Sequence, residues 1–230
     1  MQDLKRPIVA EFVGTFALVF VGGATIMNGY VANASVPLID IAVAHGLIMA
    51  LLVTATMRIS GHLNPAVTVG IAVSGRLSPS AAVVYVVSQC AGAVLAALAL
   101  EALFPPAAAH AARLGGQWVA ANVSTTSAIA LEAIATFFLV FVAYGTLVDP
   151  RGPKVGGFAI GLTVTADILA IGPRTGASMN PARSFGPALV SGNFEGHLIY
   201  WIGPIIGGIV AGLLYEWAFL RPEAASAAGD

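Results

Sequence analysis

Six long apolar stretches decide what this chain can fold into. They cover residues 7–29, 37–57, 80–103, 125–147, 155–172 and 196–219. A helix rises 1.5 Å per residue and the hydrocarbon layer of a bilayer is about 30 Å thick, so each stretch can cross a membrane, the fifth only just. Backbone groups in lipid must be satisfied within their own segment, and the alternating strands of a membrane barrel do not occur here. The sequence therefore predicts an all-α membrane protein with six transmembrane helices.

The composition excludes several other classes of protein. The chain has 230 residues and is 58% hydrophobic but only 9% charged, whereas soluble domains carry about 25% charged residues. A formal net charge of -1 without a basic run gives no sign of nucleic-acid binding. One cysteine excludes an intrachain disulfide and a multi-cysteine metal site. Hydrolase, zinc-protease and nucleotide-binding motifs do not occur either, so we expect no enzyme, no metal and no cofactor.

The distribution of Lys and Arg predicts the orientation in the membrane. With the N-terminus inside, the cytoplasmic side receives Lys5, Arg6, Arg58, Arg76, Arg151, Lys154 and Arg221, and the other side receives Arg113, Arg174 and Arg183. This asymmetry follows the positive-inside rule. We therefore predict a multi-pass protein of the cell membrane with both termini in the cytoplasm. Since no cleavage-site pattern follows the first stretch, we expect its helix to be retained.

Two further apolar segments, 65–74 and 181–190, are too short to span the membrane and would reach about 15 Å as helices. Each follows the same tripeptide, which is Asn64-Pro65-Ala66 in the first case and Asn180-Pro181-Ala182 in the second. Asparagine suits an N-cap and proline suits the first helical turn. Gly61 and Gly176 supply the turns that let the chain fold back. The pattern predicts two re-entrant half-helices.

An internal duplication relates the two halves of the chain. Landmarks recur 111 to 121 residues apart: Glu11-x3-Thr15-Phe16 as Glu132-x3-Thr136-Phe137, Gly46-Leu47 as Gly161-Leu162, Asn64 as Asn180, and Gly92 as Gly203. We expect one membrane channel domain over 1–230, with repeat one at about 1–104 and repeat two at about 125–230. Three spanning helices per repeat is an odd number, so the second copy must insert upside down. The half-helices then enter from opposite sides, and their asparagines meet in mid-membrane.

The paired boxes, "SGHLNPAVT" at 60–68 and "TGASMNPARSFGPA" at 175–188, resemble those of the major intrinsic proteins, the aquaporins and glycerol facilitators. The resemblance covers nearly the whole chain and implies a homotetramer in which each protomer has its own pore. "ADILAIGP" and "GHLIYWIGPIIGG" are similar to the tonoplast-intrinsic and aquaammoniaporin branch. Ser184 after Arg183, and Tyr200-Trp201 on the last helix, resemble the water-channel pattern rather than the glycerol-facilitator pattern.

The two asparagines are the expected pore centre. Each side-chain amide can donate a hydrogen bond to a passing oxygen, and both half-helices direct their positive dipole ends at the same place. A water molecule that accepts two such bonds cannot readily pass on a proton, and cations meet a positive field. The alternative is that Asn64 and Asn180 serve only as helix caps.

By resemblance, Arg183 belongs to a narrow selectivity filter on the outer side. A charge at this depth must face water, where its donors would repel cations and bind permeating oxygens. The alternative is a counter-ion for Glu195 or Asp167. By resemblance, the other filter positions are His45, Ile168 and Ala177, although His45 could instead simply pack in the bundle. Ala177 stands where mercury-sensitive relatives have cysteine, which implies weak inhibition by mercury.

Several other polar residues carry separate expectations. Glu11 and Glu132 are symmetric, and we expect them to accept hydrogen bonds from the re-entrant loops rather than to act as catalytic carboxylates. His62 is expected at the cytoplasmic pore mouth, either as a loop brace or as a pore lining. In the resembling branch a loop histidine joins the filter through the arginine, which makes His110 in the outer loop 104–124 a candidate. Asp167 is expected to be hydrogen-bonded between helices, with a part in the filter as the alternative.

These patterns favour a passive channel in the lipid bilayer for water, with ammonia as a second permeant, that excludes protons and ions. A facilitator of glycerol or other small neutral solutes is the alternative, against which Ser184 and Trp201 argue. A proton-coupled secondary transporter is less favoured. Inverted repeats with broken helices occur in transporters too, but a transporter would show saturable flux that depends on a pH gradient.

Overall fold

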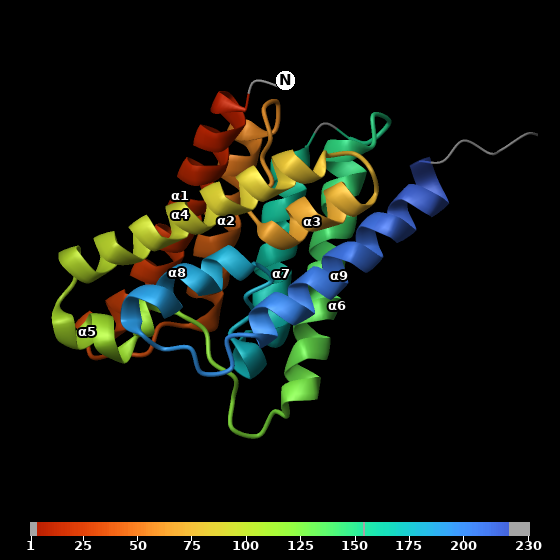
Figure 1. The fold of residues 1–230 in the computed structure, drawn as a ribbon. Helices are drawn as coiled ribbons and strands as arrows, with labels where there is room; N and C mark the ends of the chain where they lie inside the picture. The colour runs from red at the N-terminus through yellow and green to blue at the C-terminus, as the bar shows by residue number, and fades with distance from the viewer. Residues whose placement is uncertain (1–3, 154, 221–230) are drawn as a thin grey trace, which may run out of the picture.

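The computed structural model describes residues 4–153 and 155–220, and within these residues the chain is helical and has no strand. Six helices are long and apolar enough to cross a membrane, as predicted. They are α1 (Lys5–Val31), α2 (Leu38–Thr56), α4 (Pro79–Leu103), α6 (Thr125–Ala143), α7 (Gly156–Thr175) and α9 (Ile199–Tyr215). The π-helical turns Tyr144–Val148 and Glu216–Leu220 extend α6 and α9. Figure 1 shows the start of α1 and the end of α9 toward the same end of the bundle.

The two half-helices are α3 (Pro65–Val73) and α8 (Pro181–Ser191), which lie near the middle of the bundle in Figure 1. Each begins as the sequence predicts, because its asparagine is an extended N-cap and its proline occupies the first turn. The glycines before them adopt left-handed backbone conformations, with φ of 75° at Gly61 and 79° at Gly176. These turns return the chain into the bundle.

The outer loop 104–124 contains local helical structure. It contains a short helix, α5 (Pro106–Ala111), and a 3-10 turn, Arg113–Gly115. Three successive residues are left-handed there, with φ of 49° at Arg113, 55° at Leu114 and 77° at Gly115. This reversal directs the following residues back toward the bundle. Lys154 and Arg221, which entered the charge argument, lie outside the described residues.

α2 and α7 approach each other at the glycines that mark the two repeats. A Cβ atom on Gly46 would lie 2.5 Å from the carbonyl oxygen of Gly161, and a Cβ atom on Gly161 would overlap the carbonyl of Gly46. Small residues permit such close backbone contact between membrane helices. The glycines of the two duplicated landmarks therefore meet where α2 packs against α7.

The predicted pairing of Gly92 with Gly203 is wrong by about one helical turn. Gly92 packs against the carbonyl of Phe12, the residue directly after Glu11. Gly207 packs in the same way against the carbonyl of Ala133, the residue directly after Glu132. The counterpart of Gly92 is therefore Gly207 and not Gly203. Small residues recur at four-residue intervals in these helices, so their spacing alone cannot identify which turn makes the contact.

Candidate functional site

The two asparagine boxes meet, and each holds the loop of the other. Asn64 Nδ2 donates to the carbonyl of Met179, and Asn180 Nδ2 donates to the carbonyl of Leu63, both at 2.8 Å. The Oδ1 atom of each asparagine accepts from its own half-helix, which fixes the orientation of the amide. A side-chain amide carries two N–H donors, so each asparagine retains a second donor. Capping therefore uses only part of each side chain.

A narrow cavity of about 20 Å³ extends from these asparagines toward the outer side. Its polar wall is formed by Asn64, Asn180 and Arg183, and apolar side chains of α1, α2, α6 and α7 line the remainder. His45, Ile168 and Ala177 line the same cavity. The fold thus brings all four expected filter residues and both asparagines to one space.

Arg183 is buried and is held from two sides. Its Nη2 lies 2.9 Å from Nε2 of His45, and its Nη1 donates to the carbonyl of Gly115 at 3.3 Å. His45 Nδ1 lies 2.8 Å from the carbonyl of Ile41. Because a carbonyl can only accept, Nδ1 carries the proton, and Nε2 accepts from the guanidinium. His45 therefore does more than pack in the bundle.

Ala177 owes its place in the cavity wall to a difference between the two loops. Two residues separate Gly61 from Asn64, whereas three separate Gly176 from Asn180. Ala177 directly follows Gly176 and is itself left-handed, with φ of 47°. Its backbone N–H donates to the Thr175 hydroxyl at 3.1 Å. The longer second loop therefore supplies a wall for the outer half of the cavity.

A second cavity, of about 200 Å³, lies on the outer side of Arg183. It is lined by Ile26, Leu38, Ile41, Gln117 and Trp118, and it shares Ile168 and Arg183 with the inner cavity. The expected filter position therefore stands between an outer vestibule and the asparagine boxes.

The structure does not bring His110 to the filter. His110 is exposed on α5 and lines a surface cavity with Glu101 and Arg113. The residue of the same loop that reaches the boxes is Gln117, whose Oε1 accepts from the Ser184 hydroxyl at 2.6 Å. The expected role of His110 is therefore not supported. The sequence carries no signal for Gln117, because the reversal at 113–115 decides which loop residue points inward.

Gln117 lies next to the filter, between Gly176 and Ser184. A Cβ atom on Gly176 would lie 2.8 Å from its Cβ, so the side chain packs directly on the turn that precedes Ala177. Its Nε2 atom is buried and has no hydrogen-bond partner within the part of the chain that the structure describes. The amide is thus an available donor at the outer edge of the filter.

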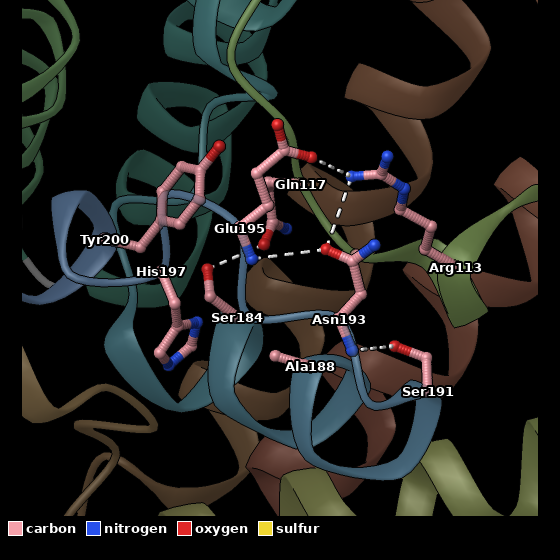
Figure 2. Close-up of a pocket in the computed structure, with 10 residues that line it drawn as sticks. Arg113, Gln117, Ser184, Ala188, Ser191, Asn193, Glu195, His197 and Tyr200 are labelled. Carbon is pink, nitrogen blue, oxygen red and sulfur yellow. Dashed lines mark hydrogen bonds and ion pairs between the residues drawn. The ribbon is translucent and has the colours of Figure 1, made fainter. Parts of the chain in front are cut away.

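Polar side chains line a separate small pocket, of about 10 Å³, beside α8. Figure 2 shows the residues that line it. Arg113 lies 3.6 Å from Glu195 and donates to Asn193 at 3.4 Å. The partner of Glu195 is thus Arg113, and Glu195 is not the counter-ion of Arg183. His197 also lines this pocket and accepts from Trp201 Nε1 at 3.0 Å. Burial lowers the pKa of His197, which keeps the ring neutral at neutral pH.

Glu11 and Glu132 accept hydrogen bonds from the re-entrant loops, as the sequence predicts. Glu11 accepts from the backbone N–H groups of His62 and Leu63 at 2.9 and 2.6 Å. Glu132 accepts from those of Ser178 and Met179 at 3.0 and 2.7 Å. Additional bonds come from Gln89 to Glu11 and from Thr175 to Glu132. Neither carboxylate lines the cavity, and this geometry favours the structural role.

His62 braces the first loop. Its Nδ1 lies 3.1 Å from the hydroxyl of Thr68, and the ring meets Tyr85 edge-on with centroids 5.2 Å apart. Its side chain is buried, and Thr68 also receives a bond from Gln89 at 2.9 Å. Of the two expected roles, the contacts favour the brace.

Asp167 lies outside the lining of the inner cavity, and among the described residues one of its oxygens lacks the hydrogen bond that was expected between helices. Its side chain is only 8% exposed, and its Oδ2 has no hydrogen-bond partner among residues 4–153 and 155–220. The residue is not among those that line the cavity, although its neighbour Ile168 is. The expected hydrogen bond between helices is therefore not made by this oxygen.

Two half-helices that enter a six-helix bundle from opposite sides and meet at paired asparagines define a class of membrane channels. The Major intrinsic protein family model matches residues 1–215, and the chain belongs to this family. Aquaporin TIP4-4 of Zea mays is 43% identical over 224 residues, which cover 94% of this chain and 87% of that protein. Aquaporin TIP2-1 of Arabidopsis thaliana is 41% identical over 224 residues, with 94% and 88% covered.

A solved structure shares the fold. The X-ray structure of the aquaglyceroporin from Plasmodium falciparum superposes with a TM-score of 0.81 and covers 93% of this chain and 96% of that chain. At 23% sequence identity this likeness concerns the fold alone. The predicted architecture of six spanning helices and two half-helices is thereby confirmed.

Proposed function

We propose that the protein is a passive channel that conducts water and excludes protons and ions. The observation that carries this proposal is the single cavity that both asparagine amides and Arg183 line together with His45, Ile168 and Ala177. The names of the relatives, which are aquaporins, support the same conclusion.

The free donors at the boxes explain how water would pass while protons would not. A water molecule between Asn64 and Asn180 accepts from both remaining N–H groups, so its oxygen cannot also accept from a neighbouring water. This interrupts the chain of hydrogen bonds that proton transfer requires. The positive ends of α3 and α8, together with the charge of Arg183, oppose the entry of cations.

The composition of the filter favours ammonia as a second permeant. Arg183 presents donors on one side, whereas Ile168 and Ala177 are apolar. A small neutral solute such as NH3 can accept a hydrogen bond from the guanidinium while its other side contacts the apolar wall. A solute with several hydroxyl groups would lose hydrogen bonds to water at that wall.

The assembly and the topology belong to the same proposal. We infer a homotetramer of protomers that each form one channel domain from the two repeats, 1–104 and 125–230. Three arginines lie in connections at the end of the bundle where α1 begins: Arg58, Arg76 and Arg151. Under the positive-inside rule this supports cytoplasmic termini. Placement in the cell membrane stays a prediction from the sequence.

Stopped-flow light scattering on reconstituted vesicles tests the proposal. We expect water permeability several-fold above that of protein-free vesicles, ammonia permeability also above it, and glycerol permeability at the protein-free rate. Fast glycerol flux with little water flux would identify a solute facilitator instead. Saturable flux that requires a pH gradient would identify a transporter.

A further inference from the structure

Two adjacent glycines of α1, Gly22 and Gly23, pack against the two groups that hold Arg183. Gly22 contacts the imidazole of His45, the acceptor for Nη2 of the arginine. Gly23 contacts Gly115, whose carbonyl is the acceptor for Nη1. Neither glycine bonds to the arginine itself.

At Gly22 there is no room for a side chain. A Cβ atom there would overlap Nε2 of His45 and would lie 2.6 and 2.7 Å from the Cε1 and Cδ2 atoms of the ring. The ring cannot yield freely, because its Nδ1 is tied to the carbonyl of Ile41 at 2.8 Å and its Nε2 to Arg183 at 2.9 Å. Protein interiors are close-packed, so a methyl group at this position must break at least one of these bonds. The open side of the ring is the cavity.

At Gly23 the close contact is with the backbone of the outer loop. Gly115 has φ of 77°, and a Cβ atom on it would overlap the Cα atom of Gly23. A Cβ atom on Gly23 would lie 3.1 Å from the carbonyl oxygen of Leu114 and 2.5 Å from Cδ1 of Leu100. A side chain at residue 23 would therefore push the 113–115 turn outward and withdraw the Gly115 carbonyl from Arg183.

We propose that the Gly22–Gly23 pair positions Arg183 through His45 and Gly115, and so sets the width and the selectivity of the filter. The inference rests on the proposed function and deepens it. Both glycines are positioning residues. A methyl group at residue 22 drives the imidazole toward the cavity and narrows it, whereas a methyl group at residue 23 frees one side of the guanidinium and admits wider neutral solutes.

The test compares Gly22→Ala, Gly23→Ala and a matched control in reconstituted vesicles. We expect Gly22→Ala to lower water permeability per channel about fivefold or more, because a single-file constriction tolerates little narrowing. Gly23→Ala should raise the ratio of urea to water permeability severalfold. The control is Gly145→Ala in the π-helical turn that extends α6, where the nearest neighbour of a Cβ atom would be the Tyr215 hydroxyl at 3.3 Å. It should conduct like the wild type.

A double variant separates positioning from general damage to the helix. If the methyl group acts through the imidazole, Gly22→Ala/His45→Ala should conduct water like His45→Ala alone, to within about twofold. Equal water permeability of Gly22→Ala and wild type, or independent losses in the double variant, would overturn the proposal. If Gly22→Ala fails to fold, recovery of folded protein by His45→Ala supports the proposal, and failure to recover it contradicts the proposal.

A spectroscopic readout keeps the two proposals distinguishable. The ¹⁵N resonance of His45 Nε2, assigned by its loss in His45→Ala, should shift in Gly22→Ala and remain in place in Gly145→Ala. If the wild type conducts no water but the His45 resonance still shifts in Gly22→Ala, only the proposed function is contradicted. If the wild type conducts water but the His45 resonance does not shift in Gly22→Ala, only the positioning role is contradicted.

Discussion

Asn64 and Asn180 bind each other's loops reciprocally: the side-chain amide of each donates, at 2.8 Å, to the carbonyl of the residue directly before the other asparagine. Those same preceding residues, Leu63 and Met179, are left-handed with φ of 52° and donate their N–H groups to Glu11 and Glu132. Each box is therefore fixed by one glutamate from its own half and one asparagine from the other half. This arrangement leaves two amide donors at the centre of the bundle.

Replacing Arg183 should relax the exclusion of other solutes. In Arg183→Val the filter loses its charge and its donors, so we expect water flux to continue while urea and proton permeability rise by about tenfold or more. Solute-swelling and proton-flux assays on vesicles would measure this. Unchanged exclusion of both urea and protons would remove Arg183 from the filter.

Mercury should inhibit the wild type weakly and an Ala177→Cys variant strongly. Ala177 lines the inner cavity, whereas Cys90, the one cysteine of the chain, lies on α4 and packs against a buried cluster that contains Val19 and Ala93. A thiolate-bound mercury ion at residue 177 would obstruct the passage. Water permeability before and after HgCl2, with reversal by a thiol, is the measurement. Strong block of the wild type that Cys90→Ser abolishes would contradict this prediction.

Glu132→Gln should destabilise the second re-entrant loop. The wild-type carboxylate accepts from Thr175, Ser178 and Met179, and an amide nitrogen in place of one oxygen leaves at least one buried donor unpaired. The expected cost is about 1–3 kcal/mol of unfolding free energy. Thermal unfolding in detergent would show a lower Tm, and Glu11→Gln should behave alike. An unchanged Tm in both variants would argue against the structural role.

Asp167→Asn should stabilise the protein and leave its water permeability unchanged. Asp167 is buried, and its Oδ2 has no partner among the described residues. Replacing an ionisable group at this depth with a neutral one of the same shape removes the cost of burying a charge, so we expect a higher Tm. Tm and water permeability are measured on the same preparation. A loss of permeability at full stability would show that the carboxylate serves conduction.

Asp149 should give the protein a pH-dependent stability at acid pH. Hydrogen bonds from Arg151 lower the pKa of Asp149 from 3.8 to about 2. A carboxylate with a lowered folded-state pKa stabilises the fold above its ordinary pKa, and this contribution is lost as the pH falls from about 4 to 2. The difference in Tm between wild type and Asp149→Asn should shrink across that window. Arg151→Gln should narrow this window without removing it, because the backbone N–H of residue 151 and the Tyr215 hydroxyl still donate to Asp149. A constant difference in Tm would contradict the assignment.

Local properties of the sequence were sufficient to predict the spanning helices and the two half-helices that begin at the asparagine boxes. Hydropathy along the chain predicted the six spans to within a few residues, because satisfying backbone groups in lipid leaves few alternatives to a helix. The asparagine caps, the prolines after them and the turn glycines Gly61 and Gly176 marked both half-helices, since each acts within a few residues of its own position. The duplication then predicted that Asn64 and Asn180 meet.

The tertiary structure alone decided which groups surround Arg183. The left-handed turn at 113–115 directs Gln117 inward and leaves His110 outside, and it aims the carbonyl of Gly115 at the guanidinium. The rotation of α1 about its axis places Gly22 against His45. Such contacts depend on the register and rotation of packed helices and on the path of a loop. Hydropathy is averaged over whole turns, so it fixes where a helix lies in the membrane but not which side chain it turns toward its neighbour.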